Sequence, residues 1–198
     1  MVMQSCAENL ALLAEPDRAA ADIAEFRRAA ERVTALIHDL VDESRAQPPA
    51  AVGSIDLNQV IAGAREPLSR LLGETVELSL RLSSDRLAVA AEPDDIEGIL
   101  LNLALNAREA MPTGGRLTIA TTPLGSRVRF TVTDTGVGMD PEVSARIFDP
   151  FFTSKATGAG IGLNSVALAV RHLNGTISVE TRLGGGTAIH IVFPLAKA

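Results

Sequence analysis

The fold prediction for this 198-residue chain rests on Asn102-Leu103-Ala104-Leu105-Asn106-Ala107 and three motifs that follow it. These are Asp134-Thr135-Gly136-Val137-Gly138, Phe148-Asp149-Pro150-Phe151-Phe152-Thr153-Ser154-Lys155 and Gly158-Ala159-Gly160-Ile161-Gly162-Leu163. Each motif alone is ambiguous, because glycine pairs usually mark turns and asparagines usually cap helices or face solvent. Their order along the chain is the specific signal.

The first motif lies on a predicted helix over 94–111. Its apolar residues recur at three- and four-residue steps along one face: Ile96, Ile99, Leu100, Leu103 and Ala107. Asn102 and Asn106 are four residues apart, so they share a face of this helix. Similar patterns predict helices over 57–72, despite one internal proline, and over 165–173.

Alternating apolar and polar residues predict six strands, at 75–82, 87–90, 116–122, 127–133, 176–181 and 187–193. The third and fourth are expected to pair antiparallel, and Asp134 stands where the fourth ends. These elements predict an α+β fold, a two-layer α/β sandwich in which helices cover one face of a mixed sheet and the other face stays relatively open.

Residues 1–46 are rich in Ala, Leu, Glu and Arg and are interrupted only at Glu15-Pro16-Asp17, which predicts an α-helical hairpin. Its second helix carries an apolar stripe that two helices cannot bury alone. We therefore expect a homodimer through residues 1–47, forming a four-helix bundle. The chain is thus divided into a hairpin at 1–47, a linker at 48–54 and a second domain at 55–198.

Composition excludes several kinds of partner. With 18 basic and 24 acidic residues the net charge is −6, and there is no basic run, so no nucleic acid partner is expected. The single cysteine, Cys6, fits a reducing compartment. Because the sequence has neither a membrane-length apolar stretch nor a signal peptide, we expect a cytoplasmic protein with no membrane segment in this chain.

Asn106 and Asp134 have distinct chemical uses. Asn106 offers an amide oxygen, a hard ligand that suits Mg²⁺ when phosphate oxygens and waters complete the shell. Asp134 can accept a hydrogen bond from the exocyclic amine of adenine, whereas guanine presents a carbonyl there. Gly136 and Gly138 let the backbone approach a flat base. Together these residues predict a site for an adenine nucleotide with Mg²⁺.

Gly158, Gly160 and Gly162 precede a predicted helix. Without side chains, they leave amide N–H groups open to a polyphosphate at the positive end of the helix dipole.

The segment between Asp134 and these glycines is long enough to close over a nucleotide as a lid. Its clustered Phe148, Phe151 and Phe152 indicate a hydrophobic latch, and Lys155 stands where it can meet a phosphate.

In this order the motifs resemble the N, G1, F and G2 boxes of bacterial sensor histidine kinases, in the GHKL ATPase superfamily shared with gyrase and mismatch-repair proteins. Gly184-Gly185-Gly186-Thr187 resembles the G3 element, and the likeness runs from about Ile55 to Leu195. The resemblance implies a domain that binds ATP and Mg²⁺, with Asn106 holding the metal. It implies these ATP-binding residues: Asn102, Asn106, Asp134, Gly136, Gly138, Phe148, Lys155, Gly158, Gly160, Gly162, Leu163 and Thr187.

Two positions depart from the family pattern, Glu109 and, mildly, Ile161, which replaces a more usual leucine or threonine. Glu109 stands where family members often carry a basic residue, with Arg108 beside it. Asn102, the predicted catalytic position, stands where ATP-hydrolysing relatives carry a glutamate that acts as a base for water. Because an amide has no useful basicity, Asn102 favours phosphoryl transfer to a supplied nucleophile over hydrolysis.

A histidine kinase needs an acceptor histidine, and the chain has three, His38, His172 and His190. His38-Asp39-Leu40 imitates the start of an acceptor motif, but Asp42 does not continue it. We therefore disfavour His38 and expect the acceptor upstream of this chain, as in a fragment or a degenerate kinase. The resemblance also implies relay to the receiver domain of a response regulator.

Three alternatives stay open. A serine-directed anti-sigma-factor kinase of the same superfamily would lack the hairpin at 1–46. An ATP-gated clamp would need a base near Asn102 and a transducer domain. A degenerate histidine-kinase-like interaction or phosphotransfer module would have decayed motifs, which the intact Asn106 and Asp134 oppose.

Overall fold

The computed structural model describes residues 53–150, 152–153 and 162–196, which belong to the second of the chain's two units, residues 51–198. The predicted hairpin with His38, the linker up to residue 52, and Lys155, Gly158 and Gly160 lie outside the described residues. In chain order the elements are β1 (Ser54–Asp56), α3 (Leu57–Gly63), α4 (Arg65–Leu72), β2 (Val76–Arg81), β3 (Ala88–Ala90), α5 (Pro93–Ala110), β4 (Gly115–Leu124), β5 (Arg127–Asp134), α6 (Pro141–Ser144), α7 (Gly162–His172), β6 (Thr176–Thr181) and β7 (Thr187–Pro194).

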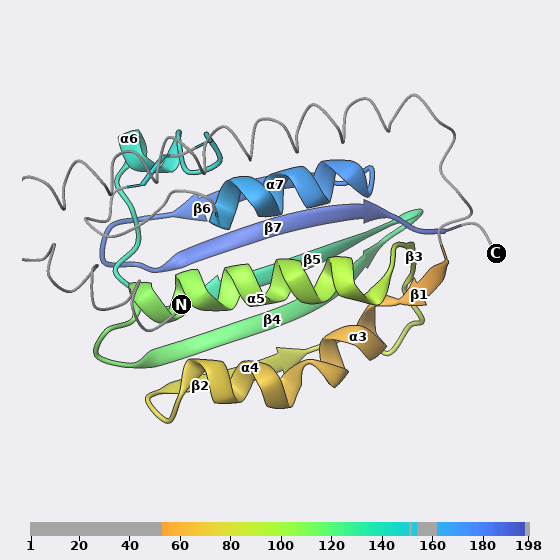
Figure 1. Cartoon of the computed structure of the whole chain (residues 1–198), viewed down its shortest axis with the longest axis horizontal. Coiled ribbons are helices and arrows are strands. Elements are labelled where there is room, and N and C mark those ends of the chain that lie inside the picture. The colour runs from red at the N-terminus through yellow and green to blue at the C-terminus, as the bar shows by residue number, and fades with distance from the viewer. Residues whose placement is uncertain (1–52, 151, 154–161, 197–198) are drawn as a thin grey trace, which may run out of the picture. The chain divides into compact units, whose positions relative to one another are not determined.

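One mixed sheet forms the base of this domain. Its strand order is β2-β4-β5-β7-β6; β2 and β4 run parallel, and the other neighbouring pairs run antiparallel. Figure 1 shows α4, α5 and α7 side by side on one face of the sheet, with α5 between the other two. The predicted α+β sandwich is confirmed, as are all six predicted strands.

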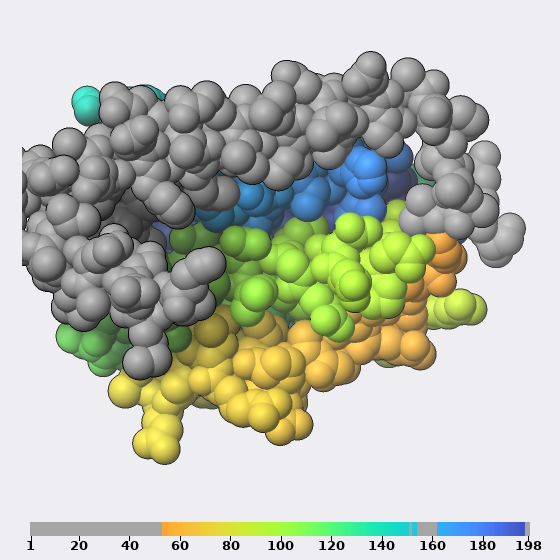
Figure 2. Space-filling view, viewed as in Figure 1, coloured from red at the N-terminus to blue at the C-terminus, as the bar shows by residue number. Residues whose placement is uncertain are grey.

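The core lies between the helices and the sheet, because each strand turns alternate residues toward the helices. From β5 these residues are Val128, Phe130 and Val132, at most 5% exposed. The predicted apolar face of α5 is buried against them. On the helical side, α4 and α5 form a continuous surface (Figure 2). The opposite face of the sheet carries partly exposed polar residues such as Thr131 and His190.

The helix predicted over 57–72 is wrong in one respect, since the structure divides it into α3 and α4 at Gly63 and Ala64. Pro67 explains the break. Its nitrogen carries no hydrogen, and its ring collides with the helical carbonyl four residues earlier, which belongs to Gly63. In α4, Pro67 lies in the first turn, where its nitrogen needs no helical partner.

Strand β4 extends past its predicted end to Leu124, through Pro123. The proline is tolerated because β2 stops pairing with β4 at Ala120, which leaves β4 with a free edge at Pro123. The sequence did not predict β1 or the short α6. Ser54 of β1 pairs with Ala90 of β3, so regular structure begins inside the segment assigned to the linker.

A buried polar network fixes α3 to the sheet. The Thr121 hydroxyl donates to Asn58 Oδ1 at 2.8 Å and accepts from the Ser83 amide at 2.9 Å. Asn58 Nδ2 donates to the carbonyls of Ser83 and Asp85, both at 2.9 Å. Thr121 is therefore buried with its hydrogen bonds satisfied.

Candidate nucleotide-binding site

A cavity of about 520 Å³ opens beside α5, within the size range of pockets that hold small molecules. One wall is the helix face that carries Asn102, Asn106 and Glu109. A second wall is the paired end of β5 and β7, where Asp134 and Thr187 border the cavity. The structure thus brings the residues predicted for metal and for adenine to one cavity.

Asp134 presents one free carboxylate oxygen. Its Oδ1 accepts hydrogen bonds from the amides of Gly136 at 2.8 Å and Thr187 at 3.2 Å. Among the described residues no donor reaches Oδ2. Burial raises the pKa of the Asp134 carboxyl, and the two amide hydrogen bonds oppose that rise only in part. The side chain is therefore held at one oxygen and can accept from a ligand at the other.

The loop after Asp134 fits closely against the β6–β7 turn. Gly138 has a φ of +65°, and a Cβ there would collide with the Arg182 carbonyl. Gly186 has a φ of +78°, and a Cβ there would collide with the Asp134 carbonyl. Only glycine combines positive φ with such close approach, so both positions require it.

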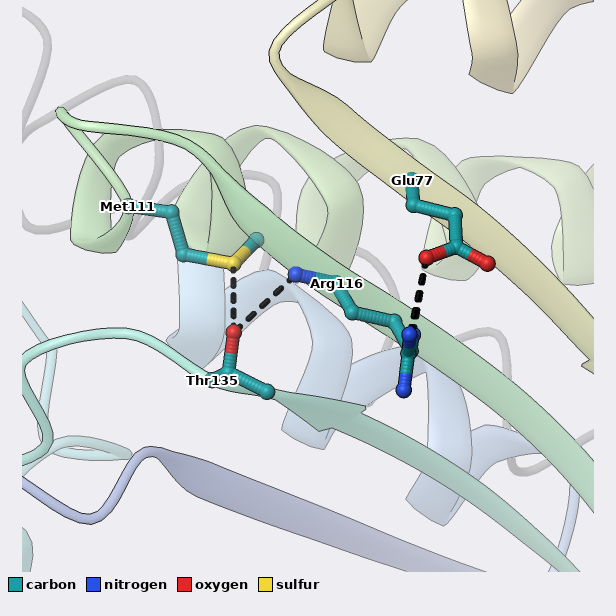
Figure 3. Close-up of polar contacts among 4 residues, drawn as sticks. All are labelled: Glu77, Met111, Arg116 and Thr135. Atoms are coloured by element: carbon teal, nitrogen blue, oxygen red, sulfur yellow. Dashed lines mark hydrogen bonds and ion pairs between the residues drawn. The ribbon is translucent and has the colours of Figure 1, made fainter.

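Thr135 ties the same loop to α5 and β4 (Figure 3). Its Oγ1 accepts from the Arg116 amide at 3.0 Å and donates to the Met111 sulfur at 3.7 Å. The Arg116 guanidinium in turn pairs with Glu77 of β2 at 2.9 Å. The position of Asp134 is therefore set by packed elements on both sides of its loop.

Gly136 and Val137 fasten the loop to the last residue of α5. A Cβ at Gly136 would lie 2.6 Å from the Ala110 carbonyl, so this glycine allows close approach to the helix. The Val137 amide donates to the same carbonyl at 3.0 Å. Gly136 does not itself line the cavity.

Asn102 and Asn106 turn their amide oxygens outward from α5. Their Nδ2 atoms donate to the carbonyls of Gly98 and Asn102, both at 2.9 Å, and no donor in the described chain reaches either Oδ1. Gly162 of α7 lies against both side chains. A Cβ there would be 3.4 Å from Asn102 Oδ1 and 3.4 Å from Asn106 Nδ2, so the missing side chain keeps this space open.

These groups fit Mg²⁺ and phosphate. Amide oxygens are hard ligands of the kind that Mg²⁺ accepts, and the start of α7 adds the positive end of a helix dipole. Among the described residues that line the cavity there is no Lys, Arg or His. A cation beside these amide oxygens would offset the negative charge of a polyphosphate bound there.

The sequence did not predict the apolar wall of the cavity. Val132 and Ile189, which pair across β5 and β7, contribute to it together with Met139, Ile147 and Phe152. Val132 is two residues before Asp134 on the same face of its strand, and this spacing could have identified it. Such a wall suits the flat faces of a base.

Phe148 lies outside the cavity wall, although the sequence placed it in the site. It is partly buried against the core, and its carbonyl accepts from Asn164 Nδ2 at 3.0 Å. Phe152 lines the cavity instead, with the Arg146 guanidinium 4.4 Å from its ring centre. The other predicted residues that line the cavity are Gly138, Gly162 and Leu163.

Known proteins share this architecture. Residues 91–197 match the family described as "Histidine kinase-, DNA gyrase B-, and HSP90-like ATPase". The sensor kinase CckA of Brucella abortus (strain 2308) is 34% identical over 190 residues, which cover 87% of this chain and 20% of CckA. The structure of the mycobacterial sensor histidine kinase MprB has a TM-score of 0.65 at 26% identity, over 74% of this chain and 99% of the solved MprB chain. Full-length ShkA, solved in complex with AMPPNP, has a TM-score of 0.61 at 27% identity, over 90% of this chain and 39% of ShkA.

The chain spans between 20% and 37% of the length of the first curated relatives. Within the described residues, none of the helices combines the length and apolar character needed to cross a bilayer. The family match covers more than half of the chain and includes α5, the Asp134 loop and β7. This chain therefore belongs to the histidine kinase-, DNA gyrase B- and HSP90-like ATPase family, and its catalytic part fits that of the sensor histidine kinases.

Proposed function

We propose that this domain binds ATP with Mg²⁺ in the cavity beside α5 and transfers the γ-phosphoryl group to a protein histidine, for relay to the receiver domain of a response regulator. The observation that carries the proposal is the single cavity bordered by Asp134 on the sheet side and by Asn102 and Asn106 on the helix side. The AMPPNP complex of ShkA supports an adenine nucleotide as the ligand.

The free oxygen of Asp134 is assigned to the exocyclic amine of adenine, with Val132 and Ile189 packed against the base. Asn106 is assigned to the metal, and Asn102 to the phosphate end of the site. When bound, Mg²⁺ neutralises charge on the phosphates. Since both asparagine nitrogens are held by the helix backbone, their oxygens face the ligand without rearrangement.

Transfer is favoured over hydrolysis because Asn102 stands where ATP-hydrolysing relatives carry a glutamate base. Its amide cannot take a proton from water, so catalysis depends on positioning and on charge neutralisation.

Neither described histidine is placed to accept the phosphoryl group. His172 is exposed at the end of α7. His190 lies on the open face of the sheet, with Nδ1 3.2 Å from Thr131 Oγ1 and Nε2 3.6 Å from a Glu180 carboxylate oxygen. We therefore propose that the acceptor is a histidine other than His38, His172 and His190. Dimerisation through residues 1–47 stays part of the proposal.

Two measurements test this function. Calorimetric titration with ATP is expected to show Mg²⁺-dependent binding, and the absence of binding would refute the nucleotide assignment. Incubation with radiolabelled ATP is expected to leave no acid-labile phosphate on this chain and to label a separately supplied histidine bundle of a sensor kinase. Label on His38 would refute the assignment of the acceptor.

A further inference from the structure

Asp134, Thr187 and Thr181 form one row across three strands of the sheet. Thr187 of β7 lies opposite Asp134 of β5 on one side and opposite Thr181 of β6 on the other. Side chains at opposite positions of paired strands share a face, here the face of Ile189, which also lines the cavity. Asp134 and Thr187 border the cavity, whereas Thr181 is not among the described residues that line it. Thr181 therefore acts on the site only through its neighbours.

The Thr181 hydroxyl makes three hydrogen bonds. Its Oγ1 accepts from the Met139 amide at 3.0 Å, donates to the Gly186 carbonyl at 2.9 Å and lies 3.2 Å from Thr187 Oγ1. A hydroxyl has one hydrogen to donate and two lone pairs that accept. The Gly186 carbonyl can only accept, so it takes the hydrogen of Thr181. In the third contact the Thr187 hydroxyl is therefore the donor.

This arrangement decides what Thr187 can offer to a ligand. Its hydrogen is directed along the row to Thr181, away from Asp134. Toward the cavity Thr187 Oγ1 therefore presents lone pairs, and the free carboxylate oxygen of Asp134 beside it also accepts. The sheet side of the cavity thus offers two neighbouring acceptors.

We propose that Thr181 is a positioning residue that fixes the Thr187 hydroxyl as an acceptor, and so strengthens the preference of the site for a purine with an exocyclic amine over one with a carbonyl in its place. The inference rests on the proposed function. The amine of adenine has two hydrogens, one for each acceptor. A carbonyl at the same position would face lone pairs on both sides, and a buried acceptor without a donor is unfavourable.

Thr181→Val tests this role, because valine keeps the shape of threonine and lacks the hydroxyl. Competition titrations give the Kd of ATP and of inosine triphosphate, whose base carries the carbonyl. In the variant the Thr187 hydroxyl is free to turn and donate to that carbonyl. The ratio of the Kd of inosine triphosphate to the Kd of ATP should therefore fall about three- to tenfold. A purely structural role would weaken both nucleotides equally and leave this ratio unchanged.

Three further variants serve as controls. Thr181→Ser keeps the hydroxyl and should keep the Kd ratio of the wild type. Thr176→Val, at an exposed position of the same strand, should also leave the ratio unchanged. Thr187→Val removes the acceptor itself and should lower the ratio. Adding Thr181→Val to Thr187→Val should then change the ratio no further, because the hydroxyl through which Thr181 acts is gone.

An unchanged ratio in Thr181→Val would overturn the inference. So would a higher ratio, because Thr187 would then face the neighbouring ring nitrogen, which accepts in adenine and donates in inosine. A fall in Thr181→Ser as large as in Thr181→Val would overturn it as well, since the lost hydroxyl would not be the cause. If circular dichroism shows that Thr181→Val does not fold, Thr187→Val decides, and equal weakening of both nucleotides would overturn the inference. A wild-type chain that binds no ATP would instead refute the proposed function.

Discussion

Asp134 and Thr187 lie opposite each other on β5 and β7, and the Thr187 amide donates to Asp134 Oδ1 at 3.2 Å. With the Gly136 amide, this contact fixes which carboxylate oxygen faces the protein and which faces the cavity. An asparagine at position 134 would keep its oxygen toward the two amides and turn its NH₂ group to the cavity. That orientation reverses the hydrogen bonding offered to a purine.

Asp134→Asn is therefore expected to weaken ATP binding by about 1–3 kcal/mol, because two donors would face each other. Binding of inosine triphosphate, whose base carries a carbonyl at that position, should improve relative to ATP. Competition titrations measure this preference, and Asp85→Asn, at an exposed position outside the cavity, should not change it. An unchanged preference for adenine in Asp134→Asn would contradict the assigned role.

The stability of the domain should depend on pH through Asp134. Since burial raises the folded-state pKa, the protonated form favours folding. This contribution is fully present below the unfolded-state pKa and is lost as the pH rises through the folded-state pKa. Relative to Asp134→Asn, which does not titrate, the wild type should lose stability across that window. Urea unfolding of both proteins from acidic to neutral pH measures the difference, and a constant difference would contradict the prediction.

Asn106→Ala removes the proposed metal ligand. We expect the gain in ATP affinity that Mg²⁺ provides to fall at least about tenfold. Removal of a residue that only supports a metal ligand already has an effect of about this size. Adenosine affinity should be unchanged, because it needs no metal. Gln59→Ala, at an exposed amide of α3, is the matched control. Equal loss of adenosine binding in Asn106→Ala would point to misfolding or to a different role.

Thr121→Val tests the buried network below α3. The change should lower the free energy of unfolding by about 1–3 kcal/mol, because Asn58 loses a donor and the Ser83 amide loses an acceptor. The same change at Thr118, on the open face of the same strand, should stay within about 0.5 kcal/mol of the wild type. Chemical denaturation measures both, and similar values for the two variants would contradict the importance of the network.

Gly138→Ala and Gly125→Ala form a matched pair, since the two glycines have φ values of +65° and +62°. Gly125 has open space around it, whereas a Cβ at Gly138 would collide with the Arg182 carbonyl. Both changes should lower the free energy of unfolding by about 1–2 kcal/mol, because alanine is strained at a positive φ. Thermal unfolding should show a larger loss of stability for Gly138→Ala than for Gly125→Ala. Gly138→Ala should also weaken ATP binding, whereas Gly125→Ala should leave it unchanged.

Much of the fold could be predicted because its signals are local. The apolar spacing of α5 and the alternation in β4, β5 and β7 are set by the periods of a helix and a strand. The break between α3 and α4 also has a local cause, because Pro67 collides with the helical carbonyl of Gly63. The sequence nevertheless predicts one helix, because the residues around Pro67 favour helix. β1 and α6 are too short for any period to show.

The site was only partly predictable because its wall depends on pairing between distant segments. Val132 and Ile189 lie on the same wall because β5 and β7 pair in a particular register. That register cannot be predicted from the spacing of residues in the sequence. The choice of Phe152 over Phe148 depends on how the chain after α6 turns toward α5. The direction of the Arg108 side chain depends on a carbonyl in α4, at Leu71.

The hydrogen bond from the Val137 amide to the Ala110 carbonyl joins the Asp134 loop to the helix that bears Asn106. The two ends of the cavity are therefore connected through α5. We expect such a pocket to distinguish ligands by their length. Nucleoside mono-, di- and triphosphates would share the base contact and be told apart by how far their tails reach along α5.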